Sequence, residues 1–297
     1  MTPQTEIGEL GVWTWLDNQP ASEAAAFARQ LERWGYSALW IPEAVGRDPF
    51  ALVAYLAANS ETLVLATGIA NIYARDPMTM RAAQLTLGEM APGRFVLGLG
   101  VSHANLVTGL RGHEYKSPVP AMRSYLEAMQ KSMFAGLKPE NEPPIVIGAL
   151  REKMLRLSAQ QTRGVHPYFV TPEHTKLARG IIGKDSWLCP EQKVLLETDP
   201  AVARRVSREA MKVYTGLPNY QNNLRVFGFD TPDFEDGGSD RLVDAIVAWG
   251  DEQAIADRIK AHMDAGADHV CIQPLRPDGG PGPDRRALEA LAPATGA

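Results

Sequence analysis

A histidine at the end of an apolar run is the first residue in this sequence that suggests chemistry. His103 follows the run Phe95–Gly100, after Val101 and Ser102. Imidazole gives and takes protons near neutral pH, so a histidine there suits the proton transfer that accompanies hydride transfer to an alkene, imine or carbonyl. The alternative is a structural histidine, because a lone histidine at a strand end more often serves packing.

A second pattern suggests an anion site. Gly148 and Ala149 precede a helical segment that carries Arg151 and Lys153. Small residues let backbone amides approach a ligand, and a helix N-terminus with basic side chains attracts phosphate. Thr171 could add a hydroxyl to the same region. The alternatives are an ordinary turn with solvated charges and, for Thr171, simple capping of the helix that follows.

These residues must be positioned by alternating strands and helices. Helices are predicted between successive strands, with Ser22 capping one at 23–34 and Thr171 capping one at 172–182. Pro190 weakens the seventh strand, and three further helical patterns follow the helix at 200–214. The eight predicted strands are 8–14, 38–41, 63–66, 94–100, 145–148, 165–170, 187–196 and 267–273.

This alternation predicts a (β/α)8 TIM barrel with extra helices between strands seven and eight, as a single domain over residues 1–297. No G-x-G-x-x-G turn follows the first strand, so a dinucleotide-binding sheet is disfavoured. Segment 101–120 reads as a long loop, which in a barrel is usually functional. Barrel chemistry lies at the carboxyl ends of strands, which selects Trp13, Glu43, 68–71, His103, 148–151, Thr171 and Gln273.

Composition limits the function further. The formal net charge of −5 disfavours nucleic-acid and membrane-surface partners, which require a basic field. Cys189 and Cys271 are far apart and lack metal-ligand spacing, so neither a disulfide framework nor a zinc site is indicated. Neither a leader nor a membrane span is evident, and a cytoplasmic protein is expected.

Several strings, taken in order, resemble the bacterial luciferase-like oxidoreductases, and within them the branch that uses the deazaflavin coenzyme F420. They are ALWIPEA, TGIANIYARDP, TMRAAQLTLGEMAPGR, FVLGLGVSHANL, GVHPYFVTPEHT, LPNYQNNLRVFGF and VAWGDEQAIADRIKAHMDAGADHVCIQ. The resemblance covers most of the chain. It implies an F420-dependent oxidoreductase acting on a small organic substrate, and it implies a homodimer.

The resemblance also assigns residues. It implies a cis peptide between Gly68 and Ile69, in a bulge that packs behind the ring of the coenzyme. Ala70 and Asn71 continue that bulge. Glu43 corresponds to an acidic residue that approaches the ring. Apart from the resemblance, Trp13 could flank a planar ring or shape the substrate pocket, although plain packing at the barrel end is the favoured alternative.

One departure from the family affects the function. Several relatives place a catalytic histidine after the residue that corresponds to Glu43, and this chain has Ala44 there. His103 is therefore the proposed substitute. Two other readings stay open, an FMN-dependent monooxygenase of the same superfamily and a barrel without activity that serves as a binding protein.

Overall fold

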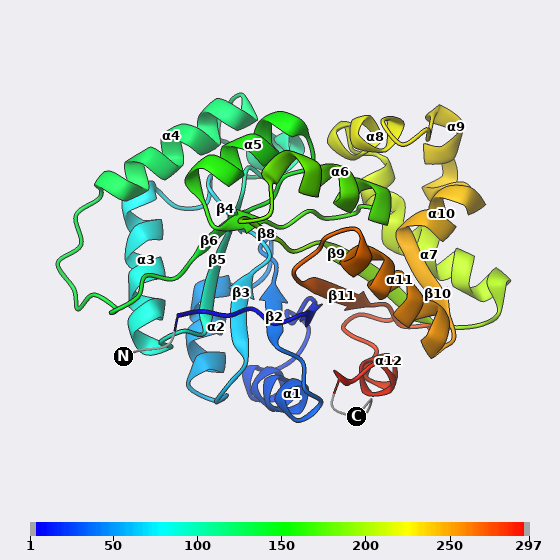
Figure 1. Ribbon diagram of the computed structural model, residues 1–297, viewed down its shortest axis with the longest axis horizontal. Helices are drawn as coiled ribbons and strands as arrows, with labels where there is room; N and C mark the ends of the chain where they lie inside the picture. The colour runs from blue at the N-terminus through cyan, green and yellow to red at the C-terminus, as the bar shows by residue number, and fades with distance from the viewer. Residues whose placement is uncertain (1–3, 294–297) are drawn as a thin grey trace.

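The computed structural model describes residues 4–293, in which eleven strands form one curled, parallel sheet (Figure 1). The strand order is β10-β9-β11-β1-β2-β3-β5-β6-β7-β8, with β4 paired to β5. The strands are β1 (Leu10–Trp13), β2 (Ala38–Ile41), β3 (Val64–Thr67), β4 (Ala70–Asn71), β5 (Phe95–Gly100), β6 (Ile145–Ile147), β7 (Gly164–Val165), β8 (Trp187–Leu188), β9 (Glu191–Leu196), β10 (Val247–Gly250) and β11 (Val270–Pro274).

The sheet curls back on itself through an interrupted strand. β8 pairs with β7 and β9 pairs with β11, while only Cys189 and Pro190 separate β8 from β9. The strand predicted over 187–196 therefore keeps its predicted ends but is interrupted, because Pro190 has no N–H to donate to the ladder. The strand predicted over 165–170 is shorter than expected. β10 was not predicted and extends the sheet beyond β9.

Helices cover the outer face of the curled sheet (Figure 1). The predicted cap at Ser22 is wrong, because Pro20 occupies the N-cap position of α1. The predicted loop contains a π-helix, η1 (Asn105–Leu110). The covering helices are α1 (Ala21–Arg33), α2 (Pro49–Ala57), α3 (Pro77–Met90), α4 (Pro118–Lys131), α5 (Glu152–Gln161), α6 (Pro172–Ile182) and α11 (Glu252–Asp264).

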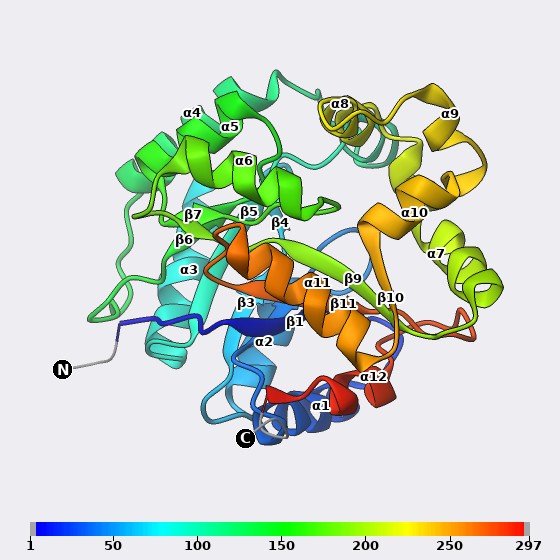
Figure 2. The same cartoon turned by 45° about the vertical axis from the view of Figure 1, so that its right-hand side comes forward.

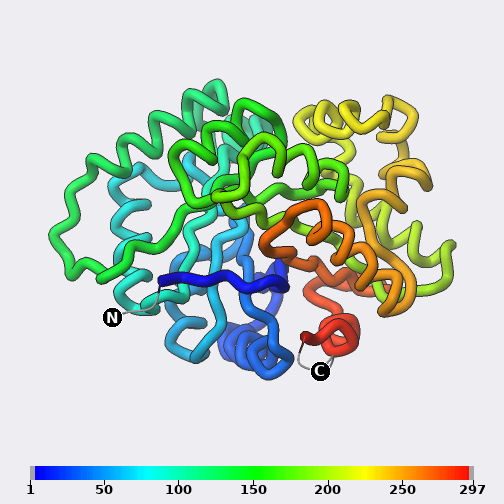
Figure 3. Tube along the Cα trace, viewed as in Figure 1, coloured from blue at the N-terminus to red at the C-terminus, as the bar shows by residue number. Residues whose placement is uncertain are grey.

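The extra helices predicted before the last strand are present and lie together on one side of the molecule (Figures 1 and 3). Their buried side chains, among them Met211, Leu224 and Leu242, form a second hydrophobic core together with Phe169 and with Leu195 of β9. Apolar burial thus holds these helices as a unit beside the sheet. The segments are α7 (Pro200–Thr215), α8 (Pro218–Arg225), α9 (Thr231–Phe234), η2 (Glu235–Gly237) and α10 (Asp240–Ile246).

Strand residues alternate between two cores. On β2, Ala38 and Trp40 belong to the inner cluster, whereas Leu39 and Ile41 pack in the outer core beneath the helices. This is the period of two that a strand covered on both faces requires. The inside of the curled sheet is therefore filled with packed side chains along these strands.

Trp40 fills the centre of this interior. Its Nε1 donates to His269 Nε2 at 3.0 Å, and its ring stacks on His166 with centroids 4.4 Å apart. Gly11 leaves the room for this arrangement, because a Cβ there would lie 2.7 Å from the His269 ring. His166 and His269 are thus structural residues of the lower barrel.

The C-terminal helix α12 (Arg285–Ala290) lies against α1, as Figure 2 shows. The Tyr36 hydroxyl donates to Leu288 O at 2.8 Å, and the Arg285 guanidinium lies over the Phe27 ring. The last described segment therefore closes the amino-terminal side of the sheet.

Three further features concern the described residues. Within 4–293, no helix is long and apolar enough to cross a membrane. The same residues contain no group of three or more histidine, cysteine or acidic side chains arranged to hold a metal ion. Cys189 and Cys271 are both free and buried.

The buried histidines predict a loss of stability in acid. Burial lowers the pKa of His166, His174 and His269 to about 4 and that of His262 to about 3. Between these values and the ordinary value near 6.5, the unfolded chain binds more protons, so stability falls as the pH falls through this window. We expect a loss of about 1 to 2 kcal/mol per histidine at about pH 5.

Urea unfolding at about pH 7.5 and about pH 5 measures this loss, and NMR titration of the ring protons assigns it. Buried histidine signals that titrate near pH 6.5 would contradict the expectation.

Candidate functional site

The bulge between β3 and β4 forms the centre of the carboxyl edge. The peptide bond between Gly68 and Ile69 is cis, which confirms what the resemblance implies. Gly68 N donates to Ile41 O at 2.8 Å, so the bulge stays tied to β2. After the bulge, Ala70 and Asn71 pair with Leu99 and Gly100 of β5.

Three glycines border the bulge, and two of them are needed to make room for it. A Cβ on Gly98 would lie 1.9 Å from Thr67 O, and one on Gly100 would lie 2.2 Å from Ile69 Cδ1. A Cβ on Gly148 would have only an ordinary contact, 3.8 Å from Ile69 Cγ2. The half-buried Ile69 therefore rests on the bare backbone of β5 and on the turn after β6. We call this surface, made by Ile69 over these three glycines, the Ile69 ledge.

Trp13 anchors the ledge from the neighbouring side. Its Nε1 donates to Gly68 O at 2.7 Å, and its side chain is almost fully buried. The Trp13 ring also contacts Trp15 edge to face at 5.5 Å and Tyr168 at 5.1 Å. Trp13 thus packs against the bulge, in agreement with the packing role that the sequence leaves open for it. Its ring also connects the bulge to Trp15 and Tyr168.

Glu43 is tied to the segment that leaves the bulge. Its carboxylate accepts from Asn71 N at 2.8 Å and from Arg75 Nη1 at 2.7 Å, and Arg75 also pairs with Asp48. Burial lowers the pKa of Arg75, but the bonds to the two carboxylates outweigh burial and raise it overall. Glu43 therefore has a structural task here, and its approach to a coenzyme ring stays a prediction.

His103 lies where β5 ends and opens the π-helix η1, since its carbonyl accepts from Leu106 N and Val107 N. Its ring lies 5.7 Å from that of Tyr220, on α8, and it hydrogen-bonds the Asn219 side chain. Burial lowers its pKa, and the bond to Asn219 offsets this only in part. The imidazole is therefore neutral at physiological pH.

The turn after β6 and the start of α6 lie together. His174 Nε2 lies 2.7 Å from Leu150 O, which fixes the turn that contains Gly148 and Ala149 against the first turn of α6. Arg151 occupies the N-cap of α5, and its side chain and that of Lys153 are exposed. Neither side chain has an ion-pair partner among residues 4–293. The structure thus brings this predicted anion site next to the α6 N-terminus.

Thr171 lies at the predicted start of α6, but its side chain does not cap the helix. It occupies the N-cap position of α6 with extended backbone, yet its hydroxyl accepts no bond from the helix. Thr171 is 3% exposed, and its Oγ1 has no hydrogen-bond partner among residues 4–293. A buried hydroxyl without a partner costs free energy, so this atom is a candidate contact for a ligand.

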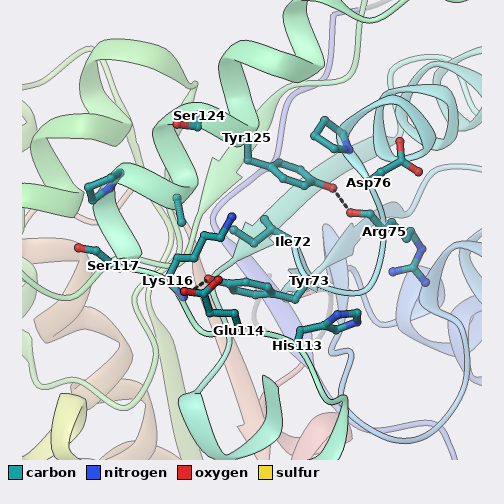
Figure 4. A pocket seen from close by; sticks show the side chains of 13 residues that line it. Ile72, Tyr73, Arg75, Asp76, His113, Glu114, Lys116, Ser117, Ser124 and Tyr125 are labelled. Atoms are coloured by element: carbon teal, nitrogen blue, oxygen red, sulfur yellow. Dashed lines mark hydrogen bonds between the residues drawn. The ribbon is translucent and has the colours of Figure 1, made fainter. Parts of the chain in front are cut away.

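A cavity of about 710 Å³ lies outside the barrel, between the segment after β4 and the start of α4 (Figure 4). The Tyr73 hydroxyl faces it and accepts from Lys116 N at 3.0 Å, while Tyr125 donates to Arg75 O at 2.7 Å. Figure 4 shows the Arg75 guanidinium directed away from this cavity. Tyr73 therefore contacts the long loop rather than the ledge.

The predictions from sequence did not include a buried polar cluster on β9, which lies under Tyr168. Lys193 and Glu191 of β9 form an ion pair inside the sheet, under the rings of Tyr168 and Tyr214. A signal was present, because two charged residues occupy alternate positions of the run EQKVLL, which otherwise reads as a buried strand. Only Gln273, a partner of Tyr168, was among the strand-end candidates.

Residues 7–269 match the model of the family described as luciferase-like monooxygenase. A Mycobacterium tuberculosis protein described as a coenzyme F420-dependent oxidoreductase is 24% identical over 250 residues, which cover 70% of this chain and 71% of that protein. The 5,10-methylenetetrahydromethanopterin reductase of Methanolobus tindarius is 27% identical over 168 residues, which cover 51% of each protein.

Two solved structures share the fold. The coenzyme F420-dependent tetrahydromethanopterin reductase of Methanopyrus kandleri superposes with a TM-score of 0.78 at 17% identity, covering 97% of this chain and 98% of that one. The oxygenating constituent of 3,6-diketocamphane monooxygenase of Pseudomonas putida, in complex with FMN, superposes with a TM-score of 0.72 at 14% identity, covering 96% and 97%.

The ledge predicts a strong position dependence of glycine substitutions. Gly98→Ala forces its methyl group into Thr67 O, so we expect a loss of about 3 kcal/mol of stability, whereas Gly148→Ala changes it by less than about 0.5 kcal/mol. Thermal unfolding of the two variants measures the difference. Equal melting temperatures would show that the backbone at Gly98 yields to the methyl group.

Proposed function

The chain belongs to the luciferase-like monooxygenase family, and we propose that within it the protein is a coenzyme F420-dependent oxidoreductase acting on a small organic substrate. The Mycobacterium tuberculosis relative and the Methanopyrus kandleri structure are both named for coenzyme F420. When bound, the deazaflavin ring supplies or accepts the hydride at its C5 carbon.

The observation that carries this proposal is the Ile69 ledge. Ile69 presents an apolar surface at the carboxyl edge, and bare glycine backbone and the Trp13 hydrogen bond hold it from behind. A planar ring gains most from such a support, because a rigid apolar surface loses little entropy when the ring packs on it. The ring would thus be held with one face on the ledge and the other toward the substrate.

The chain also has groups that fit the rest of the coenzyme. F420 carries a phosphate and an acidic tail, and Arg151 and Lys153 are free to meet them although the protein is acidic overall. The Thr171 hydroxyl is buried and without a partner among residues 4–293, and in this proposal it would bond a polar group of the coenzyme. These residues would hold the coenzyme at the carboxyl ends of the strands.

We assign the proton transfer to His103. The lowered pKa leaves its imidazole neutral, with one nitrogen able to accept a proton and the other to donate a hydrogen bond. The Asn219 side chain orients the ring. Glu43 holds the segment after the bulge, so its contribution to the reaction would be to position Asn71 near the coenzyme.

We also propose that eight of the strands make up one barrel. In this assignment β8 and β9 count as a single interrupted strand, and β4 and β10 are additions to the barrel. The strand that is interrupted at Pro190 is then the seventh strand that the sequence predicts.

A second candidate is an FMN-dependent monooxygenase. The family description and the FMN complex among the fold neighbours favour it, and a ring of similar size would fit the same ledge. The relatives named for F420 lead us to rank F420 first.

Titration of the purified protein with F420 and with FMN, followed by fluorescence, tests the proposal. We expect F420 to bind at least about tenfold more tightly, a difference of about 1.4 kcal/mol. Tighter FMN binding would instead favour the monooxygenase, and binding of neither coenzyme would favour a binding protein without activity.

Thr171→Val tests the coenzyme contact directly. The variant loses no hydrogen bond in the free protein, so its melting temperature should stay the same or rise slightly, while its affinity for F420 should fall about three- to tenfold. Thr171→Ser keeps the hydroxyl and serves as the control. Unchanged F420 affinity in the valine variant would show that this hydroxyl does not contact the coenzyme.

A further inference from the structure

A cavity of about 540 Å³ lies beside the loop that follows β2. Residues 43–48 of this loop, residues 74–75 after β4 and residues 110–111 at the end of η1 form its walls. We call it the β2 cavity. It is distinct from the cavity in Figure 4, and Arg75 belongs to the walls of both. The charges on its walls indicate what it can hold.

Three arginines and two carboxylates line the β2 cavity. Arg75 lies 2.7 Å from Glu43 Oε1 and also pairs with Asp48, so this one arginine serves both carboxylates. Figure 4 shows its guanidinium directed away from the neighbouring cavity. The other two arginines, Arg47 and Arg111, form no ion pair with a carboxylate among residues 4–293. Their positive charge is therefore unmatched in the described part of the chain.

Arg47 has donors without acceptors. A guanidinium carries five N–H groups. Arg47 Nη2 donates to Gln19 O, whereas Arg47 Nη1 is buried and has no hydrogen-bond partner among residues 4–293. The nearby Asp17 carboxylate accepts from the backbone N–H of Arg47 at 2.8 Å rather than from its guanidinium. A buried charged donor without an acceptor costs free energy, so this arginine suits an acceptor that a ligand supplies.

Arg111 reaches the same loop from the end of η1. Its Nη2 donates to Ala44 O at 2.9 Å, which is the one side-chain hydrogen bond that Arg111 makes among residues 4–293. This bond holds the half-buried guanidinium against the loop that also carries Arg47. The remaining N–H groups are free, and the planar fork of an arginine fits two oxygens of a carboxylate or phosphate. Two arginines from separate segments thus line one cavity with unused donors.

Two exposed apolar side chains belong to the same walls. Val45 is 73% exposed and Leu110 is 62% exposed, and both line the β2 cavity. Large apolar side chains gain free energy when a ligand removes their surface from water. The ligand that matches these walls therefore combines an anionic group with an apolar body.

We propose that the β2 cavity binds a small organic anion, whose carboxylate or phosphate group is held by Arg47 and Arg111 and whose apolar part contacts the exposed apolar side chains of the walls. Such an anion is either a substrate of the proposed oxidoreductase or a separate small molecule, and both share this chemistry. Glu43 connects the cavity to the segment that leaves the bulge, because it accepts from Asn71 N at 2.8 Å. The site itself does not depend on the proposed coenzyme.

Benzoate, benzamide and benzylammonium are probes of similar size that differ in charge. Ligand-observed NMR titration of the whole protein should show that benzoate binds at least about fivefold more tightly than either other probe, because only benzoate accepts charge-assisted hydrogen bonds from guanidinium groups. Equal binding of the three probes would overturn the proposal.

Substitution of the arginines locates the site. Arg111→Gln and Arg47→Gln should each weaken benzoate binding about three- to tenfold and leave benzamide binding unchanged. Arg111→Lys keeps the charge without the planar fork and should lose less. Arg205→Gln, an exposed change on α7, is the matched control and should have no effect. Benzoate binding that is unchanged in both glutamine variants would overturn the proposal, and the comparison of probes on the unaltered protein decides the matter if a variant does not fold.

Titration with F420 at saturating benzoate distinguishes the two sources. A changed F420 affinity would show that the anion lies beside the coenzyme, as a substrate must, whereas an unchanged affinity would assign the cavity to a separate small molecule. A protein that prefers benzoate but does not bind F420 would keep the anion site and overturn the proposed coenzyme. Binding of F420 without a preference for benzoate would overturn only the anion site.

Discussion

The structure of the site depends on one buried hydrogen bond, from Trp13 Nε1 to Gly68 O. It ties the end of the first strand to the bulge after the third and so fixes the position of the Gly68 carbonyl. Behind it, Gly98 lets the backbones of β3 and β5 approach more closely than any side chain would allow. Close packing then leaves Ile69 a single place to lie, and this makes a rigid apolar ledge from a short irregular segment.

The polar groups of the site come from local arrangements of charged side chains rather than from the net charge of the chain. The chain is acidic, with a formal net charge of −5, yet Arg151 and Lys153 are exposed beside the α5 N-terminus. On the opposite side, the Lys193 charge is matched by Glu191 inside the sheet. One part of the site thus carries exposed basic side chains, and another holds a buried lysine whose charge is already paired.

Much of the fold could be predicted, and the misses have physical causes. Apolar runs between glycine and proline gave β2 its bounds, and the family resemblance gave the cis peptide at Gly68. Pro190 divides the seventh strand because it lacks an N–H, and β10 was missed because it is a short strand beside helical patterns. Thr171 occupies the predicted N-cap position of α6 with extended backbone, but its hydroxyl accepts no bond from the helix. Local patterns indicate conformation more reliably than hydrogen-bond partners.

By itself the sequence determined the order of strands and helices, and hence that Trp13, Glu43 and His103 lie at carboxyl ends of strands, because these features follow from periodicity along the chain. Only the tertiary structure decided what each polar atom meets. It paired Glu43 with Arg75, left the Thr171 hydroxyl free, and placed Lys193 under Tyr168. Those partners come from segments distant in the chain, and their separation depends on how strands and inserted helices pack together, which no local pattern encodes.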